Sequence, residues 1–153
     1  LNQLSETDKR QFLKVAHHGV ISPELGASGL SGEVIDYDLD GRLDIVTGNE
    51  RGQWHLFKNS HNNQSNFLKV KLPISNKNNI TSLGAIVKLQ ACGISQQKRV
   101  GASGANYATS YDLNLHFGLG QCEKIDSVAI NWSNDDTNKY SNIEINQTFN
   151  VKQ

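Results

Sequence analysis

The sequence predicts an all-β fold, in which a three-stranded β meander is followed by a β-sandwich or barrel domain. Three observations lead to this prediction. Short segments that are β-branched, or that alternate between apolar and polar residues, recur along the chain, and clusters of Gly, Asn and Ser separate them. No segment has the apolar period of a long helix. Short strands at this spacing are typical of sandwiches and barrels.

The N-terminal segment carries few signals. Ser5 can cap a polar helical turn or two that ends near Lys14, and residues 15–30, rich in Gly, Ser and Ala, are expected to form a loop. His17 and His18 are adjacent, so their side chains point apart, and no Cys or His lies at ligand spacing beside them. We therefore expect a surface pair at these histidines and not a metal site.

The three strands of the meander are expected at residues 32–36, 43–48 and 53–59. The first two strands flank an acidic loop, and the turn residues Gly48 and Asn49 close the second strand. The acidic loop therefore lies at the first turn of the meander.

The acidic loop has the spacing of a calcium-binding loop. Its carboxylates stand at loop positions 1, 3, 5 and 9, and they are Asp36, Asp38, Asp40 and Asp44. Ca²⁺ prefers about six to eight oxygen ligands, which alternate side chains of a tightly curled loop can supply. Gly41 permits the sharp turn, since glycine has no Cβ atom. We therefore predict a Ca²⁺ site made by these four side chains and the carbonyl of Arg42.

The residues that flank the loop decide between two kinds of calcium loop. An EF-hand requires a helix on each side and a glutamate at position 12, whereas position 12 here is Thr47 and the flanks are short and β-branched. The remaining alternative is a solvated acidic turn without an ion. We favour the Ca²⁺ site, because ordinary turns rarely alternate four acids around a glycine.

A polar run at Ser60–Ser65 is the predicted boundary between two domains, at residues 1–60 and 61–153, because no apolar pattern crosses it. The strands expected in the second domain are residues 67–72, 84–91, 97–100, 112–117, 127–132 and 148–151. Cys92 and Cys122 are the only cysteines and lie beside glycine turns. We predict a disulfide between them, worth about 3 to 4 kcal/mol in the chain-entropy model; two buried thiols are the alternative.

Both domains resemble known families. The run from Asp36 to Val46, together with Leu56–Asn59, resembles an FG-GAP or VCBS-type repeat, which forms one blade of a calcium-binding β-propeller. The second domain resembles the ASPIC/UnbV domain of the cartilage acidic protein family. The matching pieces are residues 67–72, 83–89, 101–107, 116–120, 125–132 and 146–147. The resemblance implies an extracellular module of adhesive, structural or protein-interaction type, with a single blade where a propeller needs four or more.

Several function classes are disfavoured. The 15 basic and 15 acidic residues balance and form no basic run, which argues against nucleic acid or an anionic membrane as a partner. No apolar stretch is long enough to span a membrane. No Gly-x-Ser-x-Gly nucleophile elbow occurs, and His116 lies in a strand pattern where a hydrogen-bonded histidine is favoured over a catalytic base. We therefore predict that the chain is not an enzyme, with a hydrolase as the least favoured alternative.

We expect a secreted or cell-surface Ca²⁺-binding module that acts in structure, adhesion or protein interaction. Its expected partners are other protein chains, including copies of itself in an oligomer or filament, or glycans. The second hypothesis is a lectin-like module, because aromatic faces suit sugars. The aromatic candidates are Trp54, Tyr107, Tyr111, Trp132 and Tyr140. Core packing is the expected role of the two tryptophans, since both lie in strand patterns.

Overall fold

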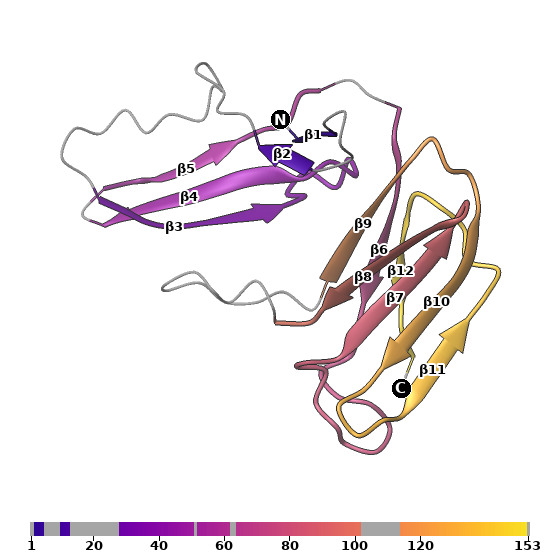
Figure 1. Ribbon diagram of the computed structural model, residues 1–153. Helices are drawn as coiled ribbons and strands as arrows, with labels where there is room; N and C mark the ends of the chain where they lie inside the picture. Colours follow the sequence, from indigo (N-terminus) through magenta and orange to yellow (C-terminus); the bar gives the residue numbers. More distant parts are fainter. Residues whose placement is uncertain are drawn as a thin grey trace.

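The computed structural model describes residues 2–4, 10–12, 28–50, 52–61, 64–101 and 114–152. Within these ranges all regular structure is β-strand, with no helix and no closed barrel, and the prediction of an all-β fold is confirmed (Figure 1). The described part of the chain accordingly contains no helix of the length and apolarity that crossing a membrane requires.

The N-terminal sheet is an antiparallel meander with the strand order β3-β4-β5, as the sequence predicts (Figure 1). Its strands are β3 (Ser28–Ile35), β4 (Asp44–Glu50) and β5 (Trp54–Phe57). β3 begins within the segment expected to be loop, and the register between β3 and β4 shifts between Gly29 and Ser31. The extra length of β3 was missed because glycine and serine are weak strand formers, and pairing with β4 overrides that preference.

A short antiparallel pair precedes this sheet. Its strands are β1 (Asn2–Leu4) and β2 (Arg10–Phe12). The expectation of helical turns is wrong for residues 10–12, because pairing with β1 outweighs the weak local cap signal at Ser5. The rest of that expectation, together with His17 and His18, lies outside the described residues.

Two sheets form the second domain (Figure 1). The first has the order β11-β10-β7-β8, and its strands are β7 (Ile86–Ala91), β8 (Ile94–Arg99), β10 (Ile125–Asn131) and β11 (Thr137–Tyr140). The second has the order β12-β6-β9, and its strands are β6 (Asn66–Lys71), β9 (Asn114–Gly120) and β12 (Gln147–Asn150). Neighbouring strands are antiparallel except β12 and β6, which are parallel.

The apolar faces of these two sheets enclose the core of the second domain. In β6, Leu68 and Val70 are completely buried in this core. Successive residues of a strand point to opposite faces, so Phe67, Lys69 and Lys71 lie on the outer face of the same strand. This alternation decides which side chains of the second domain can meet the N-terminal sheet.

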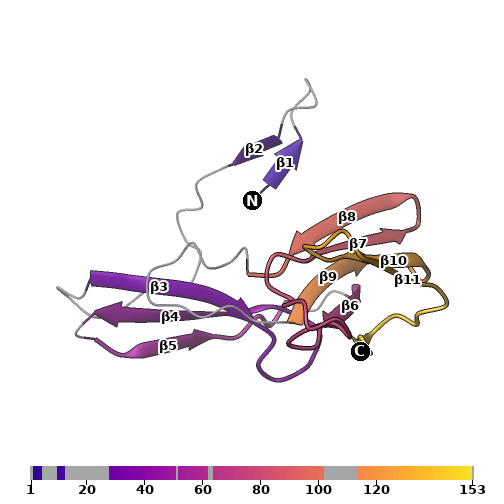
Figure 2. The same cartoon turned by 90° about the horizontal axis from the view of Figure 1, so that it is seen from below.

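The loop between β3 and β4, residues 36–43, meets that outer face. Figure 2 shows the β3-β4-β5 sheet beside the second domain, with one end of the sheet next to β6 and β9. An ion pair between Lys69 and Asp36 and a hydrogen bond between His116 and Gly41 cross from the second domain to this loop. The acidic loop therefore lies at the joint between the two parts of the molecule.

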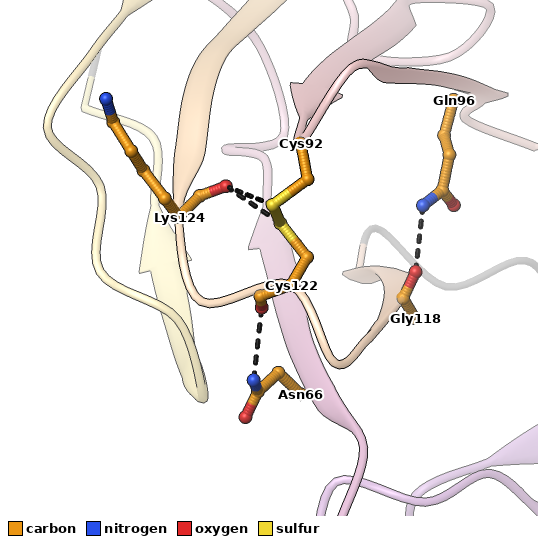
Figure 3. Close-up of a disulfide and its surroundings, with 6 residues drawn as sticks. All are labelled: Asn66, Cys92, Gln96, Gly118, Cys122 and Lys124. Atoms are coloured by element: carbon orange, nitrogen blue, oxygen red, sulfur yellow. Dashed lines mark hydrogen bonds between the residues drawn. A yellow bond between two sulfur atoms is a disulfide. The ribbon is translucent and has the colours of Figure 1, made fainter.

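A disulfide between Cys92 and Cys122 links the two sheets of the second domain at one end, with the Cα atoms 6.0 Å apart (Figure 3). Cys92 lies in the turn between β7 and β8, and Cys122 lies between β9 and β10. Nearby, the Gln96 side chain donates a hydrogen bond of 2.8 Å to the Gly118 carbonyl. Asn66 donates one of 3.0 Å to the Cys122 carbonyl. The disulfide and both hydrogen bonds thus hold the same end of the domain closed.

Candidate metal centre

Three carboxylates of the acidic loop converge. One oxygen atom each of Asp36, Asp38 and Asp40 lies within 4.8 Å of the other two. Oxygens that ligate one Ca²⁺ at about 2.3 to 2.6 Å can lie this far apart on opposite sides of the ion. The loop achieves the curl with left-handed backbone at Leu39 (φ 62°) and Gly41 (φ 87°). The arrangement can therefore accept one hard cation.

Asp36 is the most informative member of this group. Asp36 is only 7% exposed. Its Oδ2 atom accepts a hydrogen bond of 2.8 Å from the Gly41 N–H and pairs with the Lys69 ammonium. Its Oδ1 atom is buried and has no hydrogen-bond partner in the described part of the chain. A buried carboxylate oxygen without a partner is costly, and a bound cation would remove that cost.

Cationic side chains partly neutralise the carboxylates. The Lys58 ammonium lies 2.5 Å from Asp38 Oδ2, and the Arg42 guanidinium pairs with Asp40. The hydrogen bond from Lys58 lowers the pKa of Asp38, and the same contact raises the pKa of Lys58. Asp38 is thus ionised at neutral pH, which is the form that binds a metal ion.

Asp44 lies deeper than the other aspartates and is completely buried. Its Oδ2 accepts a hydrogen bond of 3.2 Å from the Tyr37 N–H, and its Oδ1 accepts one of 2.7 Å from the Asn59 N–H. Asp44 does not belong to the group of three converging carboxylates. Its two hydrogen bonds tie the start of the loop to the end of β5.

Asn59 completes this brace after β5. Its side-chain amide donates to the Leu43 carbonyl at 3.3 Å, and its own carbonyl accepts from Arg42 Nε at 2.9 Å. The segment after β5 therefore fixes the loop from one side. Lys58 and Asn59, which follow β5, thus hold the acidic loop in place.

Residues of the second domain fix the loop from the other side. His116 Nε2 lies 2.8 Å from the Gly41 carbonyl and, because a carbonyl only accepts, this nitrogen carries the proton. Burial lowers the pKa of His116, so the ring is neutral at pH 7. Phe67 stacks on His116 with ring centroids 5.6 Å apart and planes 8° apart. Any Cβ atom at position 41 would overlap the Phe67 ring.

The sequence missed these contacts from the second domain. Phe67, Lys69 and His116 follow the loop by many residues, and only the registry of β6 with β9, which pairs Lys69 with His116, brings them together. The alternation in β6 indicates that Phe67 and Lys69 share a face. Nothing in the sequence indicates that this face meets the acidic loop.

The aromatic candidates divide between surface and core. Trp132 is 4% exposed, so its expected core role is confirmed. Trp54 is 67% exposed, and the expectation that it packs in a core is wrong, because the buried apolar cluster of the described residues lies entirely in the second domain. Tyr140 packs edge-on against Phe149 at 5.0 Å between ring centroids. Tyr107 and Tyr111 lie outside the described residues.

Comparison with known proteins gives one finding. Residues 75–153 match the protein family described as ASPIC and UnbV. No curated protein matches the chain. The match begins after β6, although β6 is the central strand of the β12-β6-β9 sheet, so the folded domain starts before the matched residues. The match does not include residues 28–59, whose resemblance to an FG-GAP or VCBS repeat stays a prediction.

Proposed function

The chain belongs to the ASPIC and UnbV family, and from this premise we propose that it is a Ca²⁺-binding structural and interaction module whose ion stabilises the joint between the N-terminal sheet and the family domain. The proposal extends to adhesion as the broader role, because a braced joint of this kind suits a module that positions binding surfaces.

One observation carries the proposal: the buried, unpartnered Oδ1 atom of Asp36 at the point where three carboxylates meet. Asp36, Asp38 and Asp40 would hold the ion, and the carbonyl of Arg42 is the predicted backbone ligand. Asp44, whose oxygens both accept backbone N–H bonds, would orient the loop and add negative charge. The hard oxygen donors suit Ca²⁺ better than a softer metal.

The ion would stabilise the folded chain and would not take part in catalysis. It would supply charge neutralisation that Lys69 and Lys58 now supply. Each lysine holds a long side chain in one geometry, which costs side-chain entropy. A divalent ion brings two positive charges to the point where the three carboxylates meet, and it leaves the contacts of Gly41 with Phe67 and His116 in place.

Two independent features support an extracellular location. The chain has a disulfide between Cys92 and Cys122, and disulfides persist in oxidising environments outside the cytosol. Loops of this kind with modest affinity fill at the millimolar Ca²⁺ found outside cells. Both features support a secreted or cell-surface protein.

Calcium titration of chelator-treated protein tests the proposal. At a Ca²⁺ concentration of about 100 times the dissociation constant, mass action adds about 2.7 kcal/mol to the free energy of unfolding, which raises Tm by about 5 to 10 °C for a chain of this size. Isothermal titration calorimetry should show one binding event per chain.

Variants locate the site. Asp36→Asn and Asp38→Asn should each remove most of the thermal shift, because each loses a charged ligand. Asp126→Asn is the matched control, since Asp126 is exposed on β10 and outside the converging group. Absence of both heat and thermal shift in the natural chain would show that the loop does not bind Ca²⁺. An unchanged response in both loop variants would place the ion elsewhere.

A further inference from the structure

A cleft of about 1090 Å³ lies between the N-terminal sheet and the second domain. Its floor is the outer face of the β12-β6-β9 sheet. Alternate residues of these strands line it, and the registry places them side by side: Lys69, Lys71, Asn114, His116, Thr148 and Asn150. The cleft is thus built from two parts of the chain that the acidic loop joins.

Two strand edges form the walls of this cleft. Five consecutive residues line one wall: residues 33–35 end β3, and residues 36–37 begin the acidic loop. Residues 97–99 of β8 line the other wall. Because successive side chains of a strand point to opposite faces, a consecutive run means that the strand's edge borders the cleft. β3 and β8 are outer strands of their sheets in the described part of the chain.

The cleft is cationic on the side of the second domain. Four cationic side chains line it, against the two carboxylates of Glu33 and Asp36. Lys69 is already paired with Asp36. The other three cations, Lys71, Lys98 and Arg99, form no ion pair with a carboxylate of the described residues. Desolvation by burial lowers the pKa of Lys98, in keeping with the absence of an acid partner for it among the described residues.

The opposite wall is apolar and open. Val34, Ile35 and Tyr37 are about half exposed, and Leu39 is 77% exposed. Exposed apolar side chains that gather beside a cleft mark a binding surface more often than chance placement does. A ligand that fits both walls must therefore carry anionic groups on one side and apolar groups on the other.

We propose that this cleft binds an extended acidic polypeptide segment of a partner protein, which adds to the outer edge of β3 at Val34 and directs its carboxylates toward Lys71, Lys98 and Arg99. An extended chain meets both requirements, because its alternate side chains point to opposite sides. Addition of a strand to an open edge is a general mode of peptide recognition. At about 1090 Å³, the cleft is slightly larger than a typical small-ligand site of about 300 to 1,000 Å³, and so it holds a short segment and not a folded domain.

The β3 edge contains a group that a partner strand can satisfy. The Val34 N–H donates a hydrogen bond of 3.2 Å to Oε1 of the neighbouring Glu33 side chain. A carbonyl of an added strand can replace this carboxylate oxygen, since both accept from the same N–H. The other Glu33 oxygen, Oε2, is buried with no hydrogen-bond partner in the described residues. Displacement of the Glu33 side chain by an added strand would therefore cost little.

Fluorescence anisotropy with labelled peptides tests the proposal on the full chain. The probe is a short acetylated and amidated peptide that alternates glutamate and valine. The matched control peptide alternates lysine and valine. We expect saturable binding of the acidic probe that weakens as salt increases, because exposed charge pairs are screened, and no binding of the basic peptide.

Two variants test the two walls. Lys98→Glu/Arg99→Glu should weaken binding of the acidic probe by about tenfold or more, from the loss of two attractive contacts and the gain of two repulsive ones. Lys88→Glu/Lys139→Glu makes the same change of charge on the exposed residues of β7 and β11, outside the cleft, and should leave binding unchanged. Val34→Pro, which removes the N–H of the edge, should also weaken binding by about tenfold if the peptide pairs with β3.

Each other result would overturn the proposal. Failure of the acidic probe to bind, or equal binding of both peptides, would remove the acidic segment as the occupant. Equal loss in the control double variant would mean that net charge and not the cleft controls binding. Full binding by a folded Val34→Pro variant would refute strand addition. Saturable binding of a sulfated oligosaccharide without binding of the peptide would make the occupant a glycan.

Discussion

Gly41 connects the acidic loop to the second domain at the scale of a single residue. It has a left-handed backbone (φ 87°), and a Cβ atom there would overlap the Phe67 ring. Gly84 has nearly the same backbone (φ 81°), but nothing lies within 4 Å of a Cβ atom at that position. The two glycines therefore separate backbone strain from steric overlap.

We expect Gly41→Ala to destabilise the chain more than Gly84→Ala does. Both variants lose about 1 to 2 kcal/mol through the left-handed backbone, and only Gly41→Ala adds the overlap with Phe67, worth about 1 to 3 kcal/mol more as overpacking. Urea unfolding followed by circular dichroism measures both. The double variant Gly41→Ala/Phe67→Leu should recover part of the loss. Equal costs of the two alanine variants would mean that Phe67 does not press on this turn.

Residue spacing also explains how much of the candidate site could be predicted. Asp36, Asp38 and Asp40 converge because alternate positions of a curled loop point inward, a property of local geometry. The contacts of Lys69 and His116 with this loop depend on how two separate sheets meet, which a single sequence does not specify. Local spacing thus predicted the acidic group, whereas its neighbours from β6 and β9 could be found only in the structure.

The same distinction holds at the scale of elements. β6, β7, β9 and β10 were predicted because buried and exposed residues alternate along them. β11 was missed, since Thr137–Tyr140 buries only part of one side chain, and pairing with β10 alone makes it a strand. Apolar alternation is the signal of a strand that faces a core, and an outer strand with polar side chains does not carry it.

We expect the Cys92–Cys122 disulfide to stabilise the second domain. Its cysteines are 30 residues apart in sequence, so the chain-entropy model gives about 3 to 4 kcal/mol of stabilisation. Replacing both cysteines by alanine should lower Tm, while the core of the two sheets keeps the domain folded. A reducing agent should lower the Tm of the natural chain toward that of the double variant and leave the double variant unchanged. Two alkylatable thiols in the native, unreduced protein would contradict this prediction.

At the scale of the whole molecule, Lys69 belongs to both the acidic loop and the cleft. Its ammonium pairs with Asp36, its side chain lines the cleft, and it is largely buried between the two parts of the chain. A Ca²⁺ ion at the aspartates would neutralise Asp36 in its place. The cleft would then gain an uncompensated cation, so the calcium site and the peptide site are expected to be thermodynamically linked.

We therefore expect saturating Ca²⁺ to strengthen binding of the acidic peptide by about fivefold or more, and the peptide to strengthen Ca²⁺ binding by the same factor, because coupling between two sites is reciprocal. Anisotropy titrations with Ca²⁺ or with chelator measure the first effect, and calorimetric Ca²⁺ titrations with and without peptide measure the second. Lys69→Met should bind Ca²⁺ more tightly, since no ammonium competes for Asp36, and should lose the coupling while it keeps both binding events. Lys88→Met is the matched control and should keep the coupling. If Ca²⁺ and peptide both bind but neither affects the other, both sites stand and the role of Lys69 is contradicted. If the coupling persists in Lys69→Met, the link belongs to another residue at the joint.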